Sequence, residues 1–243
     1  MNVSSDAATN AYAAILAGGS GARMGNPEKP KQFFMLGEKP ILIHTVEKFC
    51  AFPDFMKVLV MCPEVWLQQT QDLVERHCPQ YKDRVVLVAG GVERNDTVMN
   101  AIAFLEQNCL VDDDTILVTH DAVRPFVSHR IICDNITAAR EHGACDTVVP
   151  ATDTIVESLD GCVISSIPNR SVLYQGQTPQ SFNLRKLKEL TSSLTDEERA
   201  TLTDACKIFV LRGERVVLVE GDVANMKITY PQDMRVAASL MGK

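Results

Sequence analysis

Short runs of apolar residues alternate along the chain with helical patterns, and this alternation constrains the fold more than any other feature. The runs are brief and continuously apolar, which is typical of strands covered by helices on both faces. They are expected as strands at residues 12–16, 58–61, 85–88, 116–119, 147–149 and 216–219. The sequence therefore predicts an α/β fold built on a mostly parallel sheet.

Capping residues mark helix ends between these runs. Asn95 or Asp96 can cap the helix that follows them, and Ser128 opens a pattern that ends at Gly143, a residue type common just past a helix end. Both helices are expected to pack on the sheet.

One stretch interrupts the alternation. Residues 153–174 alternate with a period of two around Asp160-Gly161, a pair typical of hairpin turns. A hairpin arm at about 151–175 would carry apolar side chains away from the sheet, where a second chain can cover them. We therefore predict a homodimer through this arm; the alternative is a hairpin folded onto its own domain.

Composition limits the class of protein. The chain has 243 residues with 46% apolar content, which suits a single domain over 1–243 with the arm as an excursion and residues 1–10 as a flexible tail. Its 24 basic against 31 acidic residues argue against a nucleic-acid partner, and no apolar window is long enough for a membrane helix. The eight cysteines are scattered without a C-x-x-C pair, so reduced thiols and a cytoplasmic location are expected.

A glycine-rich loop follows the first expected strand and carries the candidate chemistry. Glycines let backbone N–H groups approach phosphates closely. The dinucleotide spacing G-x-G-x-x-G fails because Met24 stands where the last glycine belongs, and no Gly-Lys-Ser/Thr of a P-loop follows. Arg23 and Lys31 flank the loop eight residues apart, and two fixed cations suit a triphosphate whose charge grows on leaving pyrophosphate. The alternative is a glycine turn with surface cations.

The loop and Pro30-Lys31-Gln32 resemble the nucleotidyltransferases of the glycosyltransferase-A-like fold, a Rossmann-like architecture. Within that group the chain is similar to the methylerythritol-phosphate and ribitol-phosphate cytidylyltransferases, from about residue 12 to the C-terminus. Other matching segments are Gly90-Gly91-x-x-Arg94, His120-Asp121-Ala122-Val123-Arg124-Pro125, Asp153-Thr154, Thr178-Pro179-Gln180, Thr203-Asp204-Ala205 and Asn225-Met226-Lys227-Ile228-Thr229.

The resemblance implies transfer of CMP from CTP to D-ribitol 5-phosphate, giving CDP-ribitol for teichoic-acid synthesis in the cell wall, with pyrophosphate released. Residues 167–180 and 202–207 look closer to the ribitol-phosphate enzymes. Three alternatives stay open. The acceptor could be 2-C-methyl-D-erythritol 4-phosphate of isoprenoid biosynthesis, or the chain could be a catalytically silent nucleotide-binding module; an NAD-dependent oxidoreductase is disfavoured by the glycine spacing.

The resemblance also implies roles for particular residues. The nucleotide-binding set is Leu16, Ala17, Gly18, Gly19, Gly21, Arg23, Lys31, Gly90, Arg94, Thr97 and Asp121. The acceptor-binding set is Asp121, Arg124, Thr154, Arg170 and Lys227. The catalytic cations are Arg23, Lys31 and Lys227.

The expected ligands are CTP, a sugar-alcohol phosphate and Mg²⁺, with Asp121 as the candidate metal ligand. Arg124 can bind a phosphate or anchor Asp121, whereas His120 is expected to be structural, because an anionic phosphate nucleophile needs no base. Thr154 and Arg170 would reach the neighbouring subunit's site. The family often has an acidic residue where this chain has Ala224, and Asp222 is the candidate substitute. A ribulose-5-phosphate reductase, which makes the acceptor, is a candidate partner.

Overall fold

The computed structural model describes residues 10–19, 21–24, 29–202 and 204–242. Residues 1–9 of the expected tail lie outside the described residues, and so does Thr203. A seven-stranded sheet forms the centre, in the order β5 (Val85–Ala89), β4 (Phe55–Cys62), β1 (Ala11–Leu16), β6 (Ile116–Asp121), β8 (Tyr174–Asn183), β7 (Ala144–Pro150) and β9 (Val217–Glu220). β8 runs antiparallel to both of its neighbours, and all the other pairs are parallel. The six expected strands and the mostly parallel α/β fold are confirmed.

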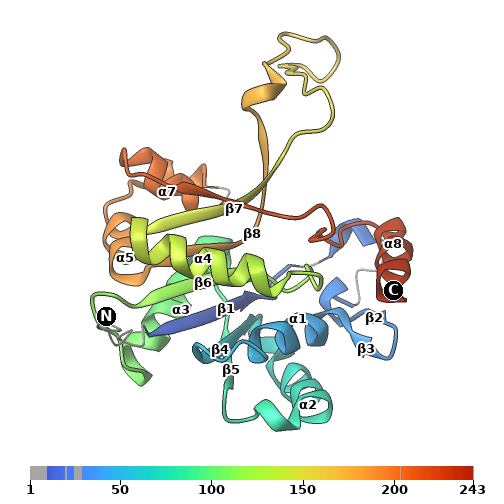
Figure 1. Cartoon of the computed structure of the whole chain (residues 1–243), viewed down its shortest axis with the longest axis vertical. Coiled ribbons are helices and arrows are strands. Elements are labelled where there is room, and N and C mark those ends of the chain that lie inside the picture. Colours follow the sequence, from blue (N-terminus) through green and yellow to red (C-terminus); the bar gives the residue numbers. More distant parts are fainter. Residues whose placement is uncertain (1–9, 20, 25–28, 203, 243) are drawn as a thin grey trace, which may run out of the picture.

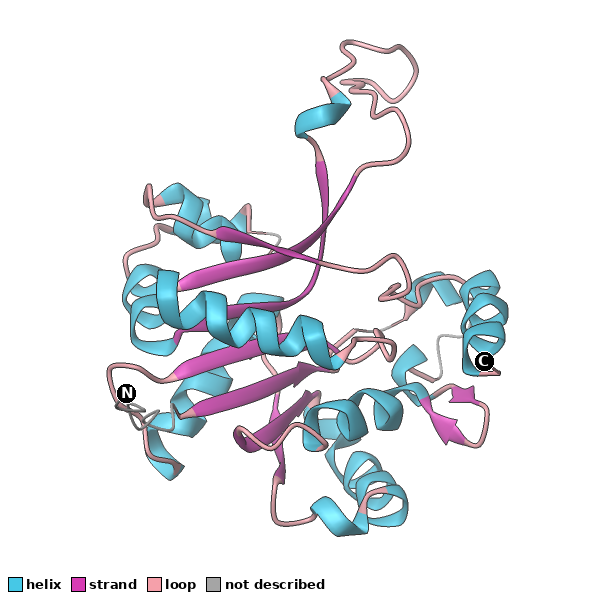
Figure 2. Ribbon diagram, in the orientation of Figure 1, coloured by secondary structure: helices cyan, strands magenta, loops and turns pink. Residues whose placement is uncertain are grey.

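Helices cover both faces of the sheet (Figures 1 and 2). α1 (Ile41–Cys50), α2 (Leu67–His77) and α4 (His129–His142) pack on one face, and α3 (Arg94–Asn108), α5 (Leu184–Ser192) and α7 (Cys206–Leu211) on the other. β1 sends Ala13 and Ile15 into the first core and Tyr12 and Ala14 into the second, as the two-residue repeat of a strand requires.

A smaller cluster beside the carboxyl ends of the parallel strands joins the last helix to the body. α8 (Pro231–Met241) buries Ala237 against Leu36 of the short ribbon β2 (Met35–Leu36) and β3 (Lys39–Pro40). α6 (Asp196–Ala200) lies between α5 and α7 in the sequence. Among the described residues, no helix is both long and apolar enough to cross a membrane.

The observed helix caps match the expectation from the sequence at α4 and differ from it at α3. The Ser128 hydroxyl accepts a hydrogen bond from the Ile131 N–H at 3.3 Å, and Gly143 ends α4 with φ +83°. The expected cap at Asn95 or Asp96 is wrong: Glu93 caps α3, and the Asp96 carboxylate accepts a hydrogen bond from the Glu93 N–H at 3.0 Å. α3 therefore begins early enough to include Arg94 in its first turn.

The arm leaves the sheet between β7 and β8, the yellow and orange segment at the top of Figure 1. β7 and β8 pair as a hairpin up to Pro150↔Tyr174, and Gly161 turns the tip with φ +72°. The regular ladder expected over 153–174 is wrong, because Glu157 and Ser166 make the single bridge between the two sides of the described arm. The arm does not fold back onto its own sheet. Its exposed large apolar side chains are Ile155, Val156, Leu159, Val163, Ile164, Ile167, Val172 and Tyr174.

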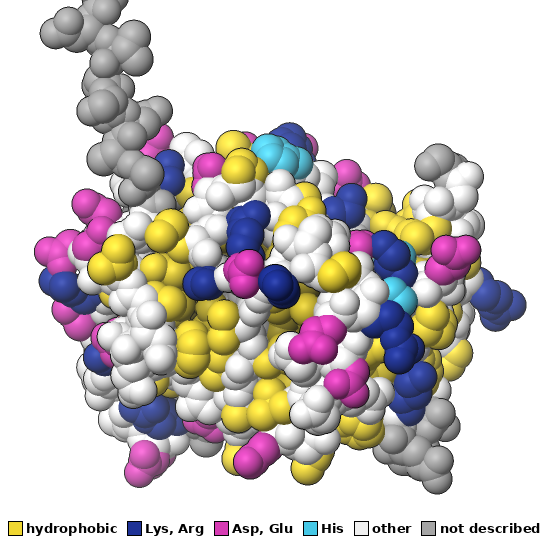
Figure 3. Space-filling model, turned by 90° about the horizontal axis from the view of Figure 1, so that it is seen from below, with side chains coloured by type: hydrophobic (Ala, Val, Ile, Leu, Met, Phe, Trp, Pro, Cys, Tyr) yellow, Lys and Arg dark blue, Asp and Glu magenta, His cyan; other side chains and the backbone are white. Residues whose placement is uncertain are grey.

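Charges are mixed over the face seen in Figure 3, where basic and acidic side chains are interspersed among apolar ones. All eight cysteines are free thiols, and burial raises the pKa of Cys50 and of Cys145 to about 12. These two thiols therefore stay protonated at neutral pH.

Candidate active site

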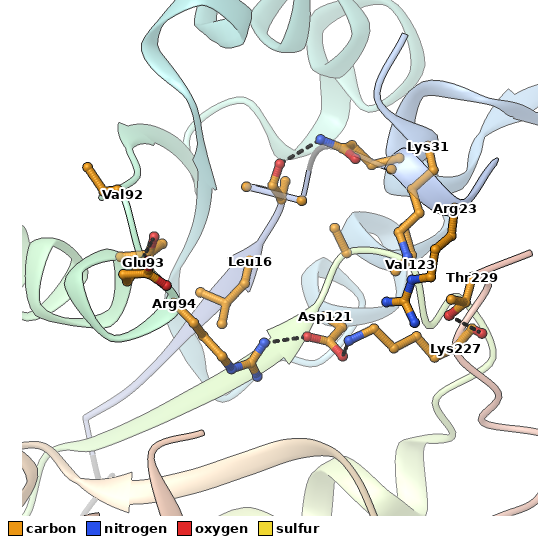
Figure 4. Close-up of a pocket in the computed structure, with 17 residues that line it drawn as sticks. Leu16, Arg23, Lys31, Val92, Glu93, Arg94, Asp121, Val123, Lys227 and Thr229 are labelled. Atoms are coloured by element: carbon orange, nitrogen blue, oxygen red, sulfur yellow. Dashed lines mark hydrogen bonds and ion pairs between the residues drawn. The ribbon is translucent and has the colours of Figure 1, made fainter. Parts of the chain in front are cut away.

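A cavity of about 340 Å³ opens at the carboxyl ends of β1 and β6 (Figure 4), the edge at which open α/β sheets bind ligands. Of the eleven residues expected to bind nucleotide, all but Gly90 line it. The expected acceptor and catalytic residue Lys227 lines it as well. Six further lining residues lie outside the sets expected from the sequence: Gln32, Val92, Glu93, Ala122, Val123 and Thr229.

The glycine loop is anchored at its start, through both backbone groups of Ala17, and packs closely against Lys31 at Gly21. The Ala17 N–H donates to the Met61 carbonyl at 2.8 Å, and the Gln32 side-chain amide donates to the Ala17 carbonyl at 2.6 Å. Gly21 has φ +72°, and a Cβ there would lie 2.9 Å from the Lys31 backbone nitrogen. Glycine at position 21 is thus what lets the loop close against Lys31.

Lys31 is buried and makes no ion pair with a carboxylate of the described residues, which is unusual for a lysine. Its Nζ donates to the Ile228 carbonyl at 2.9 Å. Burial, together with the charges of Lys227 and Arg23, lowers the pKa of Lys31 to about 8. The exposed Arg23 lies near it, with its guanidinium 5.7 Å from the centre of the Tyr230 ring. The cavity therefore concentrates positive charge at one end.

Asp121 is the centre of an ion-pair cluster. Its carboxylate is 2.6 Å from Arg94 Nη1, 2.9 Å from Lys227 Nζ and 3.4 Å from Arg124 Nε (Figure 4 shows the first two). Burial alone would raise the pKa of Asp121, but Arg94, Lys227 and Arg124 hold it well below its usual range. Asp121 is therefore ionised and fixes Arg94 and Lys227 at the cavity wall.

Arg124 and His120 lie behind this wall. Arg124 is buried outside the cavity lining and donates to the Asn225 carbonyl at 2.8 Å, so of the two expected roles the geometry favours anchoring Asp121 over binding a phosphate. His120 is fully buried between the Arg124 carbonyl and the Thr178 hydroxyl, each at 3.1 Å. Burial lowers the pKa of His120 to about 4, which keeps it neutral and structural.

The loop before α3 forms the opposite wall. The Thr97 hydroxyl accepts from the Gly91 N–H and donates to the Glu93 carbonyl, both at 3.0 Å. Gly90 lies under this loop, where a Cβ would come within 3.3 Å of the Thr97 hydroxyl. Gly90 thus shapes the wall without lining the cavity.

Thr154 and Arg170 do not join the cavity of their own chain. Both are exposed on the arm, where Arg170 Nη1 donates to the Thr152 carbonyl at 2.7 Å. Asp222 is likewise outside the lining, and its carboxylate accepts from the Ala224 N–H at 2.8 Å.

The potential metal ligands of the cavity suit a metal ion that is bound mainly by the phosphates of a triphosphate ligand. No group of three or more His, Cys, Asp or Glu side chains able to hold a metal occurs among the described residues. The cavity offers two carboxylates, and that of Glu93 caps α3. Mg²⁺ is commonly bound by one or two carboxylates plus substrate phosphates. Asp121 is the carboxylate that could take this part.

A mixed, mostly parallel sheet with a glycine loop and a cation-lined cavity at its carboxyl edge fits a nucleotidyltransferase. A family model described as IspD, 2-C-methyl-D-erythritol 4-phosphate cytidylyltransferase, matches residues 11–243. The chain belongs to this family. It is a CTP-dependent cytidylyltransferase, a class that typically uses a divalent cation.

Solved structures agree with this assignment over nearly the whole chain. The 4-diphosphocytidyl-2C-methyl-D-erythritol synthase of Anaerococcus prevotii is 24% identical with a TM-score of 0.77, and 97% of each chain is covered. The 2-C-methyl-D-erythritol 4-phosphate cytidylyltransferase of Francisella tularensis is 27% identical with a TM-score of 0.78, covering 94% of this chain and 98% of that one. The Thermus thermophilus enzyme of the same name is 26% identical with a TM-score of 0.69, covering 95% and 98%.

The lowered pKa of Lys31 predicts an alkaline limit to activity. The ammonium form attracts a triphosphate, and that form is lost as the pH rises through about 8. We expect kcat/KM for CTP to fall above this pH, because that parameter reports groups of the free enzyme. The measurement is a pH profile of pyrophosphate release. In Lys31→Arg the alkaline fall in kcat/KM should move to higher pH, since a guanidinium stays charged. If the fall stays at the same pH, a group other than Lys31 causes it.

Proposed function

We propose that this enzyme transfers CMP from CTP to the phosphate of D-ribitol 5-phosphate, giving CDP-ribitol and pyrophosphate. The observation that carries the proposal is the convergence of Arg23, Lys31, Arg94 and Lys227 on one cavity beside the glycine loop. Four cations suit a reaction between two highly anionic substrates. The sheet, its helices and the arm would act together as one domain.

The nucleotide occupies the glycine-loop side of the cavity. Backbone groups of Ala17, Gly18 and Gly19 hold it, and the loop fixed by Thr97 shapes the side that takes the cytosine and ribose. Arg23 and Lys31 contact the triphosphate. This placement is supported by the two cations lying at the end of the cavity where Gly21 packs against Lys31.

The chemistry is an in-line displacement at the α-phosphorus. An oxygen of the acceptor phosphate forms the new P–O bond as the bond to pyrophosphate breaks, so no side chain needs to remove a proton. Two unit charges 4 Å apart repel by about 4 kcal/mol at an effective dielectric near 20. Lys227 offsets this repulsion at the acceptor, and Arg23 and Lys31 offset it at the leaving group. A bound divalent cation, with Asp121 as its candidate ligand, supplies further neutralisation.

Two compounds are candidates for the acceptor substrate. Residues 167–180 and 202–207 support ribitol 5-phosphate through their resemblance to ribitol-phosphate enzymes. A second candidate, 2-C-methyl-D-erythritol 4-phosphate, is favoured by the family description and by the names of the relatives. Identities of 24–27% to those relatives leave room for a different acceptor.

Pyrophosphate release with CTP and Mg²⁺ tests the acceptor directly. Ribitol 5-phosphate and methylerythritol 4-phosphate are compared at equal concentrations by kcat/KM. Preference for ribitol 5-phosphate supports the proposal and a place in cell-wall polymer synthesis. Preference for methylerythritol 4-phosphate keeps the mechanism and moves the enzyme to isoprenoid synthesis, while release with neither acceptor rejects both.

The arm completes the site of a second subunit in this proposal. Its apolar side chains are exposed in the single chain. Thr154 and Arg170 lie on the two sides of the arm, each four residues beyond the last strand pair, Pro150↔Tyr174. A guanidinium binds phosphate through two parallel hydrogen bonds. In a homodimer Arg170 would therefore hold the acceptor phosphate of its neighbour.

Arg170→Ala is expected to raise KM for the acceptor about tenfold or more, since a charged hydrogen bond is lost, and to leave CTP affinity unchanged. Steady-state kinetics and calorimetric titration of CTP measure the two effects. Mixing the Arg170→Ala and Lys31→Ala proteins should restore part of the activity, because one of the two sites in a mixed dimer is then intact. No recovery on mixing would place both residues in the same subunit's site.

A further inference from the structure

We infer that Asp146 and Gln180 form a hydroxyl-binding subsite for the polyol chain of the acceptor. The inference rests on the proposed function. It names the residues by which the enzyme would distinguish a polyhydroxylated acceptor from a shorter one. Neither residue belongs to the cavity lining or to the sets that the sequence analysis singled out.

The two residues face each other across neighbouring strands. Asp146 of β7 is in register with Gln180 of β8, and Gln180 is in register with Thr119 of β6. The Gln180 amide donates to Asp146 Oδ1 at 3.1 Å. Thr119 and Asp121 are two residues apart on one strand and so point to the same face of the sheet. Gln180 and Asp146 therefore lie on the same face of the sheet as Asp121, one and two strands away from β6.

Gln180 carries an unsatisfied acceptor. Its side chain is 3% exposed, yet its Oε1 has no hydrogen-bond partner among the described residues. A buried carbonyl-type oxygen without a donor is costly, and such atoms are normally paired. Because the amide nitrogen of Gln180 is directed at Asp146, the unpaired oxygen belongs to the same cluster. A hydroxyl group from a ligand would supply the donor that this oxygen lacks among the described residues.

The neighbourhood of Asp146 selects the kind of ligand. Gly176 lies beside its second oxygen: a Cβ at that position would be in van der Waals contact with Asp146 Oδ2, at 3.6 Å. Burial raises the pKa of Asp146 to about 6; Asp204 also raises it, while Gln180 and Arg94 lower it. At neutral pH the cluster presents a carboxylate and an amide oxygen, and both are acceptors.

A neutral polyol matches this cluster better than the other classes of ligand. Its hydroxyls donate to the acceptors, whereas Asp146 and Asp204 would repel an anion. A metal would find too few ligands, because no group of three metal-binding side chains occurs in the described parts of the chain. Arg94 connects the cluster to the acceptor end of the cavity, since it pairs with Asp121 and its charge also acts on Asp146. A sugar-alcohol phosphate held at Lys227 would extend its hydroxyls toward Asp146.

The test is Asp146→Asn, which keeps the shape and removes the charge. We expect KM for ribitol 5-phosphate to rise about tenfold or more, since hydrogen bonds to a charged group are lost. KM for CTP and the rate with glycerol 3-phosphate, a shorter acceptor, should change less than about twofold. Gly176→Val, which places methyl groups beside Asp146 Oδ2, should have the same selective effect. Asp134→Asn, on the exposed surface of α4, is the matched control.

Calorimetric titration of ribitol 5-phosphate separates this inference from the proposed function. Tight binding to the wild type that weakens in Asp146→Asn supports the subsite, whether or not pyrophosphate is released. Equal affinity in both proteins, or no affinity in the wild type, overturns it. Absence of turnover by a wild type that binds the ligand would overturn the proposed function alone.

Discussion

Lys31→Ala is expected to lower kcat about 10²- to 10³-fold, which corresponds to roughly 3–4 kcal/mol of lost transition-state stabilisation. Lys31 is buried beside the glycine loop, where its charge is screened little by water. The negative charge that develops on pyrophosphate would then have Arg23 alone at that end of the cavity. Single-turnover pyrophosphate release with saturating CTP measures the change.

The free energy of unfolding gives an independent check on this variant. The lowered pKa shows that the fold disfavours the charged form of Lys31, so its removal should cost little stability. Lys39→Ala is the matched control, because Lys39 makes a surface ion pair with Glu47, a kind of contact worth about 0–1 kcal/mol. A folded Lys31→Ala protein with normal turnover would remove Lys31 from the proposed mechanism.

Asp121→Asn is expected to damage both stability and activity. Asp121 is 5% exposed and pairs with Arg94, Lys227 and Arg124. Removing one partner from a buried ion pair typically costs 3–5 kcal/mol, so we expect the free energy of unfolding to fall by about 3 kcal/mol. Because Arg94 and Lys227 are then no longer fixed, kcat/KM for the acceptor should fall about 100-fold or more. Denaturant unfolding and acceptor kinetics measure the two losses.

The pH dependence identifies the cause of the stability loss. Because the pKa of Asp121 is lower in the folded than in the unfolded chain, its contribution is fully present above about pH 4 and is lost as the pH falls further. The difference in stability between wild type and Asp121→Asn should therefore shrink in acid. A difference that is constant with pH would point to altered packing. Asp134→Asn, which breaks an exposed pair with Arg130, should show almost no loss.

Local sequence patterns determined much of the fold and part of the site. Continuous apolar runs predicted six strands, because strands buried on both faces must be apolar throughout. The polar strand β8 was missed, since residues such as Gln177, Thr178 and Gln180 are buried there through hydrogen bonds to neighbouring strands and loops. Asn95 and Asp96 are candidate caps by residue type, whereas the chain path places Glu93 at the cap position.

The sequence by itself determined the glycine loop, its two flanking cations and the presence of an arm, because each depends on residues that are near one another in the chain. The tertiary structure alone decided that Arg94 and Lys227 meet at Asp121, that Lys31 is buried with a lowered pKa, and that Asp146 faces Gln180. Distances, desolvation and charge coupling depend on which distant segments pack together. Spacing along the chain does not contain that information.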